Sequence, residues 1–290
     1  MHTKESTFHE LVKLIEGAGA QAHEYFMSGN TSNEQKDDGS VVTKIDRDIE
    51  TIIVDFVRTH FPDDAIRGEE HGEKEGGSGF VWHIDPIDGT DNFLRRIPFC
   101  AISVARLGDD NNHSFAIVHN PITKQTFSTF HEGATYENNR ICNLTSSLLG
   151  GKLTFSIGRG REGWMKPAGY ALQAGFGMKY GRGTSYNCTA LELAYVAADR
   201  IDAFLTYGLH SYDYAAGLLL VQTAQGAISR FEEGKGWVRY TGSIKDLCAT
   251  HGDIIFVSHP DLHDELTALI GNPRDWEKEG LPNYALFTKR

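Results

Sequence analysis

The sequence predicts an α/β protein made of two halves that differ in type. Two helical stretches open the chain and are followed by successive strand-like runs separated by turns, which is typical of an α+β half with an antiparallel meander. From about residue 150 strands alternate with helices, which indicates a layered α/β half. The runs that predict the meander are 99–107, 114–119 and 125–130.

Length and composition are compatible with two domains. The chain has 290 residues, enough for two domains of ordinary size, and its hydrophobic fraction of 40% is normal for a protein with a buried core. We place an N-terminal α+β domain at 1–149 and a C-terminal α/β domain at 150–271. The polar tail at 272–290 receives no predicted fold.

The charge balance limits the classes of partner. The formal net charge is −11, and the acidic residues are spread along the chain. Nucleic-acid polymers and anionic membranes both require basic surfaces, so neither is an expected partner. A small anionic substrate is still compatible, because bound metal ions can reverse the local field.

Cysteine usage and hydropathy predict a cytoplasmic protein. The four cysteines are far apart and form no C-x-x-C pair, which favours reduced thiols over a zinc ribbon or a redox motif. The sequence shows no export signal and no long apolar run, so we expect no membrane span. H-E-x-x-H, G-x-S-x-G and P-loop motifs are also absent from the sequence.

The first elements follow from apolar spacing. Residues 6–27 carry apolar side chains at helical intervals, and a polar loop at 28–40 contains Lys36. A second helix is expected to run to about residue 60, with Thr43 as its N-cap and Asp46 in its first turn. A short strand at 65–68 leads to Glu69 and Glu70, which taken alone resemble surface charges.

A short apolar run at 80–84 ends in two closely spaced acids. Asp85 lies where the strand is expected to end, Pro86 prevents ordinary continuation, and Asp88 returns three residues later. Both carboxylates and the carbonyl of Ile87 can then face one point, and oxygen donors of this kind suit Mg²⁺. The alternative is a solvated Asp-Gly turn, whereas an EF-hand lacks its Glu at the twelfth position.

The next two residues, Gly89 and Thr90, open a predicted helical turn. Free backbone N–H groups at such a turn attract phosphate. A metal site and a phosphate site in one turn indicate metal-assisted phosphoryl chemistry.

The second half is predicted to begin with a strand, followed by a glycine-rich stretch and then by alternating helices and strands. The glycine-rich stretch extends to residue 183 and receives no predicted element. The expected strands are 153–157, 201–205, 227–230 and 253–258, and the expected helices are 189–198, 214–225 and 260–270.

Four ordered motifs resemble those of the inositol monophosphatase family, the lithium-sensitive, Mg²⁺-dependent phosphomonoesterases. They are Trp82-His83-Ile84-Asp85-Pro86-Ile87-Asp88-Gly89-Thr90-Asp91-Asn92-Phe93, Val42-Thr43-Lys44-Ile45-Asp46, Gly68-Glu69-Glu70 and Tyr212-Asp213-Tyr214-Ala215-Ala216-Gly217. The resemblance implies a two-domain, five-layer αβαβα sandwich with the site between the domains. It also implies a homodimer.

The resemblance assigns the metal ligands. It implies two to three Mg²⁺ ions, with Mn²⁺ as a substitute. The first ion would lie on Glu69, Asp85 and the Ile87 carbonyl, the second on Asp85, Asp88 and Asp213, and a weaker third near Glu69 and water. Two ions sharing Asp85 would suit in-line displacement at phosphorus.

The resemblance also assigns catalytic and substrate-binding roles. Asp46 and Thr90 would form a hydrogen-bonded pair that deprotonates a metal-bound water, together with Glu69. The amides of Gly89 and Thr90 would hold the phosphate, and Lys36 would approach the metals from its loop. The implied substrate-binding residues are Asp88, Gly89, Thr90, Thr189, Thr206 and Asp213.

Two departures from the family pattern lie in the substrate pocket. Inositol-cleaving members carry a Glu seven residues before the second-domain Asp, and here that residue is Thr206. Their Gly-[Ser/Thr]-Ala turn falls on Asn187-Cys188-Thr189, or on Gly183-Thr184-Ser185 after a shift, and Tyr212 replaces a Trp. The departures weaken inositol phosphate as the substrate and leave phosphomonoester hydrolysis intact.

Several functions therefore stay open. The substrate is expected to be a small phosphorylated metabolite, such as an inositol, sugar or histidinol phosphate. The alternatives are a 3′-phosphonucleotide phosphatase, a fructose-1,6-bisphosphate phosphatase and a non-catalytic regulatory member of the family.

Overall fold

A computed structural model describes residues 4–29, 31–36, 41–109, 113–130, 133–145, 152–159, 165–249 and 254–273. The predicted loop at 28–40, the glycine-rich stretch and the tail therefore lie partly outside the described residues, at 30, 37–40, 160–164 and 274–290. Within the described part of the chain, no helix combines the length and the apolar character that crossing a bilayer requires.

The elements of the first half begin with two long helices. The helices are α1 (Lys4–Ser28), α2 (Lys44–His60) and α3 (Thr90–Leu94). The strands are β1 (Glu34–Gln35), β2 (Val41–Val42), β3 (Ala65–Gly68), β4 (Glu73–Lys74), β5 (Val81–Asp88), β6 (Ala101–Leu107), β7 (Phe115–Asn120), β8 (Gln125–Phe130), β9 (Tyr136–Glu137) and β10 (Arg140–Ile141).

The second half alternates strands and helices. The helices are α4 (Met165–Tyr180), α5 (Thr189–Ala197), α6 (Ser211–Thr223), α7 (Ile244–Cys248) and α8 (His263–Ile270), with a 3₁₀ turn at Pro260–Leu262. The strands are β11 (Leu153–Arg159), β12 (Gly181–Thr184), β13 (Ala203–Tyr207), β14 (Ala227–Glu232), β15 (Gly236–Arg239) and β16 (Ile255–Ser258).

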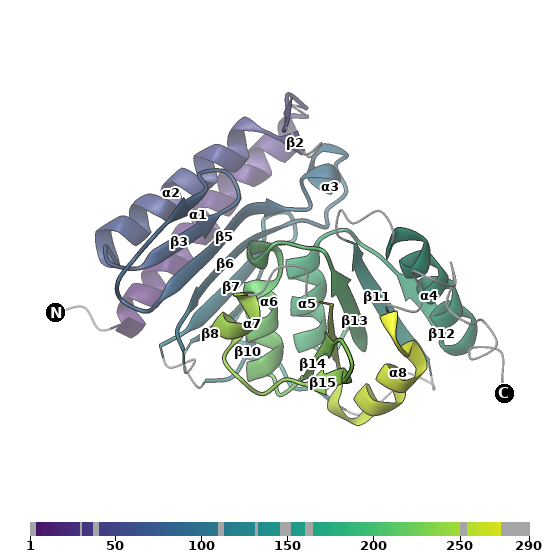
Figure 1. The fold of residues 1–290 in the computed structure, drawn as a ribbon. Coiled ribbons are helices and arrows are strands. Elements are labelled where there is room, and N and C mark those ends of the chain that lie inside the picture. Colours follow the sequence, from purple (N-terminus) through teal and green to yellow (C-terminus); the bar gives the residue numbers. More distant parts are fainter. Residues whose placement is uncertain are drawn as a thin grey trace.

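The helices and the two large sheets form five layers. The first sheet has the order β10-β9-β8-β7-β6-β5-β3-β4, and the second has the order β12-β11-β13-β16-β14-β15. Helices α1 and α2 cover the outer face of the first sheet, α5 and α6 lie between the sheets, and α4 and α8 cover the outer face of the second (Figure 1). The predicted α/β class and the αβαβα sandwich are confirmed.

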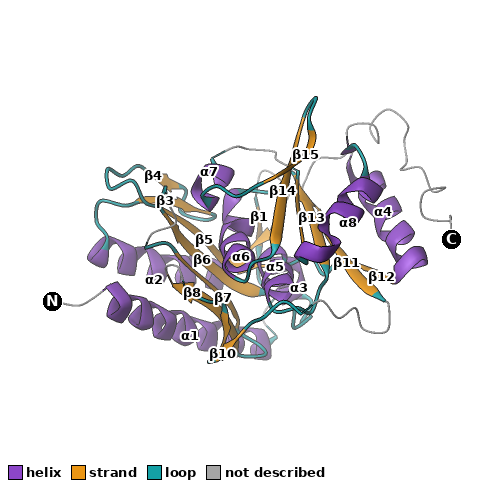
Figure 2. Cartoon of the chain, turned by 90° about the horizontal axis from the view of Figure 1, so that it is seen from below, coloured by secondary structure: helices purple, strands orange, loops and turns teal. Residues whose placement is uncertain are grey.

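Strand pairing matches the types predicted for the two halves. Strands β6, β7 and β8 form the predicted antiparallel meander, while β3 and β5 pair in parallel. In the second sheet β11 pairs in parallel with both β12 and β13, and the remaining pairs are antiparallel. The view from below shows α1 and α2 beside the first sheet, with α4 and α8 at the far side of the second (Figure 2).

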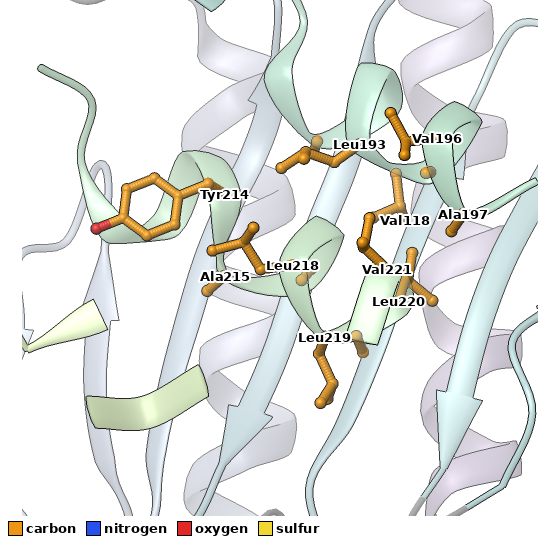
Figure 3. Close-up of a cluster of buried hydrophobic side chains, with 14 of the residues drawn as sticks. Val118, Leu193, Val196, Ala197, Tyr214, Ala215, Leu218, Leu219, Leu220 and Val221 are labelled. Atoms are coloured by element: carbon orange, nitrogen blue, oxygen red, sulfur yellow. The ribbon is translucent and has the colours of Figure 1, made fainter. Parts of the chain in front are cut away.

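The middle layer is the largest buried cluster of the core. Helix α6 contacts β5 to β8 on one side and β14 on the other, and its apolar residues pack against α5 (Figure 3). The helix is apolar all round, as expected for an element buried on every side. Gly217 allows the close approach, since a Cβ there would lie 2.4 Å from the Cβ of Leu193 on α5.

We expect Gly217→Ala to lower the free energy of unfolding by about 1–3 kcal/mol, because overpacking outweighs the gain in helix propensity. The matched control is Gly17→Ala in α1, where a Cβ would meet no atom within 4 Å. That control should raise the free energy of unfolding by about 0.5–1 kcal/mol. Urea unfolding measures both, and equal effects of the two substitutions would contradict the packing argument.

The predicted elements need correction at several places. The predicted end of a strand at Asp85 is wrong, because β5 continues to Asp88 with a register irregularity, which accommodates Pro86 and its missing N–H. The glycine-rich stretch contains α4 and β12. Strand β13 lies two residues later than predicted, and β15 and α7 were not predicted.

Candidate active site

Strands β3 and β5 bring the first two acids together. Because Gly68 pairs with Ile84 in the parallel register, the chain after β3 leaves the sheet beside Asp85. The amide of Glu69 donates to the carbonyl of Ile84 at 3.1 Å, which places the Glu69 side chain next to Asp85. The two acids therefore meet because neighbouring parallel strands end at the same edge of the sheet.

The register irregularity of β5 sets Asp88 and the turn that follows. Asp85 pairs with Ser103 and Asp88 pairs with Ala101, so one more residue separates the acids on β5 than separates their partners on β6. Gly89 then adopts φ +82°, a left-handed conformation that favours glycine. A Cβ at Gly89 would also lie 3.1 Å from the carbonyl oxygen of Asn187, so the second half packs against this turn.

Asp88 is held from the second half of the chain. Its Oδ2 accepts a hydrogen bond of 2.6 Å from the amide of Ala190 in the first turn of α5. The Cys188 thiol donates to the Asp88 carbonyl at 3.4 Å. An acid from the first sheet thus caps a helix of the middle layer, where the helix dipole favours negative charge.

Asp213 and Asp46 occupy equivalent places in two other helices. Each is the third residue of its helix, α6 or α2, and each carboxylate accepts from the backbone amide of its N-cap residue. The distances are 2.8 Å from the His210 amide to Asp213 and 3.0 Å from the Thr43 amide to Asp46. The predicted N-cap at Thr43 is confirmed.

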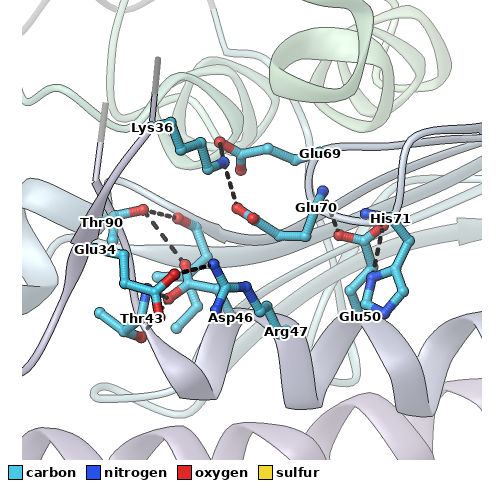
Figure 4. A network of polar contacts seen from close by, with 11 residues as sticks. Glu34, Lys36, Thr43, Asp46, Arg47, Glu50, Glu69, Glu70, His71 and Thr90 are labelled. Atoms are coloured by element: carbon cyan, nitrogen blue, oxygen red, sulfur yellow. Dashed lines mark hydrogen bonds and ion pairs between the residues drawn. The ribbon is translucent and has the colours of Figure 1, made fainter. Parts of the chain in front are cut away.

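Asp46 also reaches the turn after β5. The Thr90 hydroxyl lies 3.5 Å from Asp46 Oδ1 and 3.0 Å from the carbonyl oxygen of Ile87. The Thr43 hydroxyl donates to the other oxygen of Asp46 (Figure 4). The structure therefore places Asp46, Thr90 and the Ile87 carbonyl in one contact chain.

Lys36 lies at the outer edge of this group. Its Nζ is 3.0 Å from Glu69 Oε1 and 2.5 Å from Glu70 Oε1, so one ammonium group bridges both acids (Figure 4). The side chains of Lys36 and Glu69 are 22% and 14% exposed, so this ion pair lies at the solvent-facing edge of the group of acids.

The electrostatics of the group are those of acids crowded together. Burial, followed by the charges of Glu69, Asp88 and Asp213, raises the pKa of Asp85 well above its ordinary value. Burial and then the charge of Asp213 also raise the pKa of Asp88 well above its ordinary value. Burial raises the pKa of Asp46 to about 7, despite the hydrogen bonds from Thr43.

The donor set fits hard divalent cations. Asp85 is 2% exposed, and its Oδ1 is buried without a hydrogen-bond partner among the described residues. The surrounding donors are oxygens, the ligands that Mg²⁺ prefers. No group of three or more His, Cys, Asp or Glu side chains in the described ranges is already arranged as a metal site. Helix or N-cap amides engage one oxygen of Asp46, Asp88 and Asp213.

The comparison with known protein families decides the relationship. The profile of the inositol monophosphatase family matches residues 4–272, nearly the whole chain. The chain belongs to the inositol monophosphatase family. The resemblance read from the four motifs is thereby confirmed.

Individual members of the inositol monophosphatase family are similar over most of their length. The Nus factor SuhB of Escherichia coli K12 is 33% identical over 247 residues, which cover 80% of this chain and 86% of that protein. The extragenic suppressor protein suhB of Bartonella henselae has a TM-score of 0.77 at 25% identity and covers 91% of this chain and 97% of its own. The IMPase of Thermotoga maritima has a TM-score of 0.75 at 26% identity, covering 94% and 98%.

Two of the predicted substrate-binding residues, Thr189 and Thr206, are buried. Thr206 is 1% exposed, and its hydroxyl has no partner among the described residues. Thr206 lies inside the second sheet, on β13 between β11 and β16. Thr189 is 6% exposed at the start of α5. Their substrate-binding role stays a prediction.

The departure at Asn187 has a structural explanation. Asn187 adopts φ +56°, the left-handed region that glycine normally occupies, and asparagine tolerates it better than other side chains. The backbone course typical of a Gly-[Ser/Thr]-Ala turn is therefore compatible with Asn187-Cys188-Thr189.

Two buried acids near the site were missed. Glu50 on α2 is fully buried and accepts from the amides of Glu70 at 2.7 Å and His71 at 3.0 Å (Figure 4). Glu192 on α5 is fully buried as well. The available signal was an acid among apolar residues on a helix face, since Glu50 lies between Ile49 and Ile53 on the buried side of α2.

Proposed function

We propose that this chain is a Mg²⁺-dependent phosphomonoesterase acting on a small phosphorylated metabolite. The observation that carries the proposal is Asp85, a buried carboxylate with one oxygen unpartnered among the described residues and with Glu69, Asp88 and Asp213 around it. These acids and the Ile87 carbonyl would hold two to three Mg²⁺ ions, with Mn²⁺ as a substitute. Such ions, when bound, activate water and stabilise the leaving oxygen.

Asp46 and Thr90 would accept the proton of the attacking water. Thr90 takes the water proton on Oγ1 while it passes its own hydroxyl proton to Asp46 Oδ1, 3.5 Å away. A pKa of about 7 suits Asp46 to this role near neutral pH. The water oxygen then bonds to phosphorus, the ester P–O bond breaks, and the leaving alkoxide takes a proton from solvent.

The turn after β5 would orient the phosphate. Gly89 and Thr90 stand at the start of α3, where the first-turn amides have no acceptor inside the helix. Asp88 and Asp213 would border the substrate on the side of the middle layer, and Lys36 would stay at the outer edge. The substrate is an inositol, sugar or histidinol phosphate in this proposal, and the homodimer stays a prediction.

The second candidate is a non-catalytic binding or regulatory protein. The observation that favours it is the name of the Escherichia coli relative, which is called a Nus factor rather than an enzyme. The two candidates differ in whether phosphate is released.

A phosphoester panel separates the two candidates. Inositol-1-phosphate, histidinol phosphate, fructose-1,6-bisphosphate and a 3′-phosphonucleotide are each incubated with the protein in Mg²⁺ or in EDTA, and released phosphate is measured. We expect release from at least one ester in Mg²⁺ and none in EDTA. Ion binding by calorimetry without release from any ester would favour the binding protein.

A further inference from the structure

Glu192 on α5 is a buried acid that contacts the segment leading into this helix. Its side chain is fully buried, and its carboxylate accepts from the amides of Tyr186 at 3.0 Å and Cys188 at 3.3 Å. The Ser156 hydroxyl on β11 donates to the same carboxylate. Glu192 therefore fixes the segment 186–188, which enters α5, against the second sheet.

The same segment holds the turn after β5 of the first half. Asn92 donates from Nδ2 to the carbonyl of Tyr186 at 2.6 Å, and the Cys188 thiol donates to the Asp88 carbonyl. The amide of Ala190 is bonded to Asp88 Oδ2. A chain of direct contacts thus leads from Glu192 through one segment to one carboxylate oxygen of the candidate metal site.

Glu192 also replaces a missing cap. The N-cap residue Cys188 makes no side-chain cap hydrogen bond, so the first amides of α5 need other acceptors. Glu192 accepts from the Cys188 amide, and Asp88 accepts from the Ala190 amide. Because one oxygen of Asp88 is engaged in this way, the orientation of its other oxygen, Oδ1, is fixed.

We propose that Glu192 is a positioning residue that, through the segment 186–190, orients Asp88 Oδ1 toward the metal ions. This inference rests on the proposed function, since it gives Asp88 the role of a ligand. Groups that orient metal ligands from outside the ligand shell change metal affinity by about 10–100-fold when they are replaced.

Two substitutions test whether the position of the Glu192 carboxylate matters in addition to its charge. Glu192→Gln removes the charge, whereas Glu192→Asp keeps it on a side chain one methylene shorter, which draws it back from the Tyr186 and Cys188 amides. We expect both to weaken Mg²⁺ binding about tenfold by calorimetry. In both, the Mg²⁺ concentration for half-maximal phosphate release should rise, while kcat at saturating Mg²⁺ stays within about twofold.

The control is Asp202→Asn, another second-half acid, whose Oδ2 accepts from the Thr154 amide at 2.6 Å. It should leave Mg²⁺ affinity within about twofold of the wild type, because Asp202 contacts neither 186–190 nor Asp88 in the described hydrogen bonds. Ser156→Ala, which removes one contact of Glu192, is a milder variant and should also weaken Mg²⁺ binding. It replaces the Glu192 variants in the experiment if these fail to fold.

Hydrogen exchange of the Ala190 amide supplies a readout that needs no metal. We expect faster exchange in both Glu192 variants and no change in Asp202→Asn. Wild-type Mg²⁺ affinity in Glu192→Asp would overturn the inference, because charge alone would then suffice. Unchanged Ala190 exchange would also overturn it. If the wild type neither binds Mg²⁺ nor releases phosphate, the proposed function fails, and the exchange measurement alone decides whether Glu192 positions Asp88.

Discussion

Asp85→Asn is expected to abolish Mg²⁺-dependent phosphate release and to stabilise the metal-free protein. Losing a group that only orients a metal ligand costs up to about 100-fold, so losing the central ligand should cost more than that in kcat/KM. In EDTA the substitution removes an acid whose burial beside Glu69, Asp88 and Asp213 costs free energy, the same cost that raises its pKa. The asparagine amide can also donate to a neighbouring carboxylate. The free energy of unfolding at pH 7.5 should rise by on the order of 1–3 kcal/mol.

Mg²⁺ should stabilise the wild type but not the variant. At 100 times its Kd, Mg²⁺ adds about 2.7 kcal/mol to the wild-type stability, and it should add almost nothing to Asp85→Asn. The matched control is Asp91→Asn, which changes an exposed acid of the same motif that pairs with Arg95. Turnover of Asp85→Asn within tenfold of the wild type, or a loss of stability in EDTA, would refute the assignment.

The metal-free protein should lose stability as the pH rises from about 4 to about 7, relative to an Asp46→Asn variant. The folded-state pKa of Asp46 is about 7, whereas an unfolded aspartate has a pKa of about 3.9. The folded state therefore binds the extra proton in this interval, so the stabilisation is complete below the unfolded value and is lost as the pH passes through 7. At 1.36 kcal/mol per pKa unit the loss is on the order of 4 kcal/mol.

Urea unfolding in EDTA at a series of pH values measures this difference. Asp46→Asn keeps a carbonyl oxygen for the Thr43 amide but has no titration, so the difference between the two curves isolates Asp46. The control Asp55→Asn makes the same change at an exposed acid on the same helix and shows what the substitution alone does to the unfolding curves. A difference for Asp46→Asn that is flat with pH would show that its pKa is not raised in the folded protein.

The sequence predicted the closely spaced acids on β5, although not the end of that strand, because their signals are local. The spacing of Asp85, Pro86 and Asp88 restricts the backbone whatever surrounds it, and Thr43 caps α2 through residues only three positions away. The partners of those acids came from the family motifs, because distant residues such as Asp213 reach the site only after both sheets have formed.

What could not be predicted depends on tertiary packing. Helix α4 contains Gly169, Gly175 and Gly177, which lower helix propensity and made the stretch resemble a loop. The helix is instead held by packing, since Phe176 stacks on Phe155 of β11 with ring centroids 3.9 Å apart, and Gly169 leaves room for the Tyr207 hydroxyl. Similarly, the sequence alone does not show that Glu192 accepts hydrogen bonds from the segment 186–188, because this contact forms only in the folded chain.

The middle layer restricts how this protein can evolve by exchange or duplication of its halves. Helices α5 and α6 are encoded after residue 150, yet they bury the inner face of the sheet that is encoded before it. A boundary in chain order is thus not a boundary in packing, and neither half could be exchanged or duplicated alone without exposing a broad apolar face to water. The whole sandwich therefore evolves as one unit, and the acids that its two halves contribute stay together.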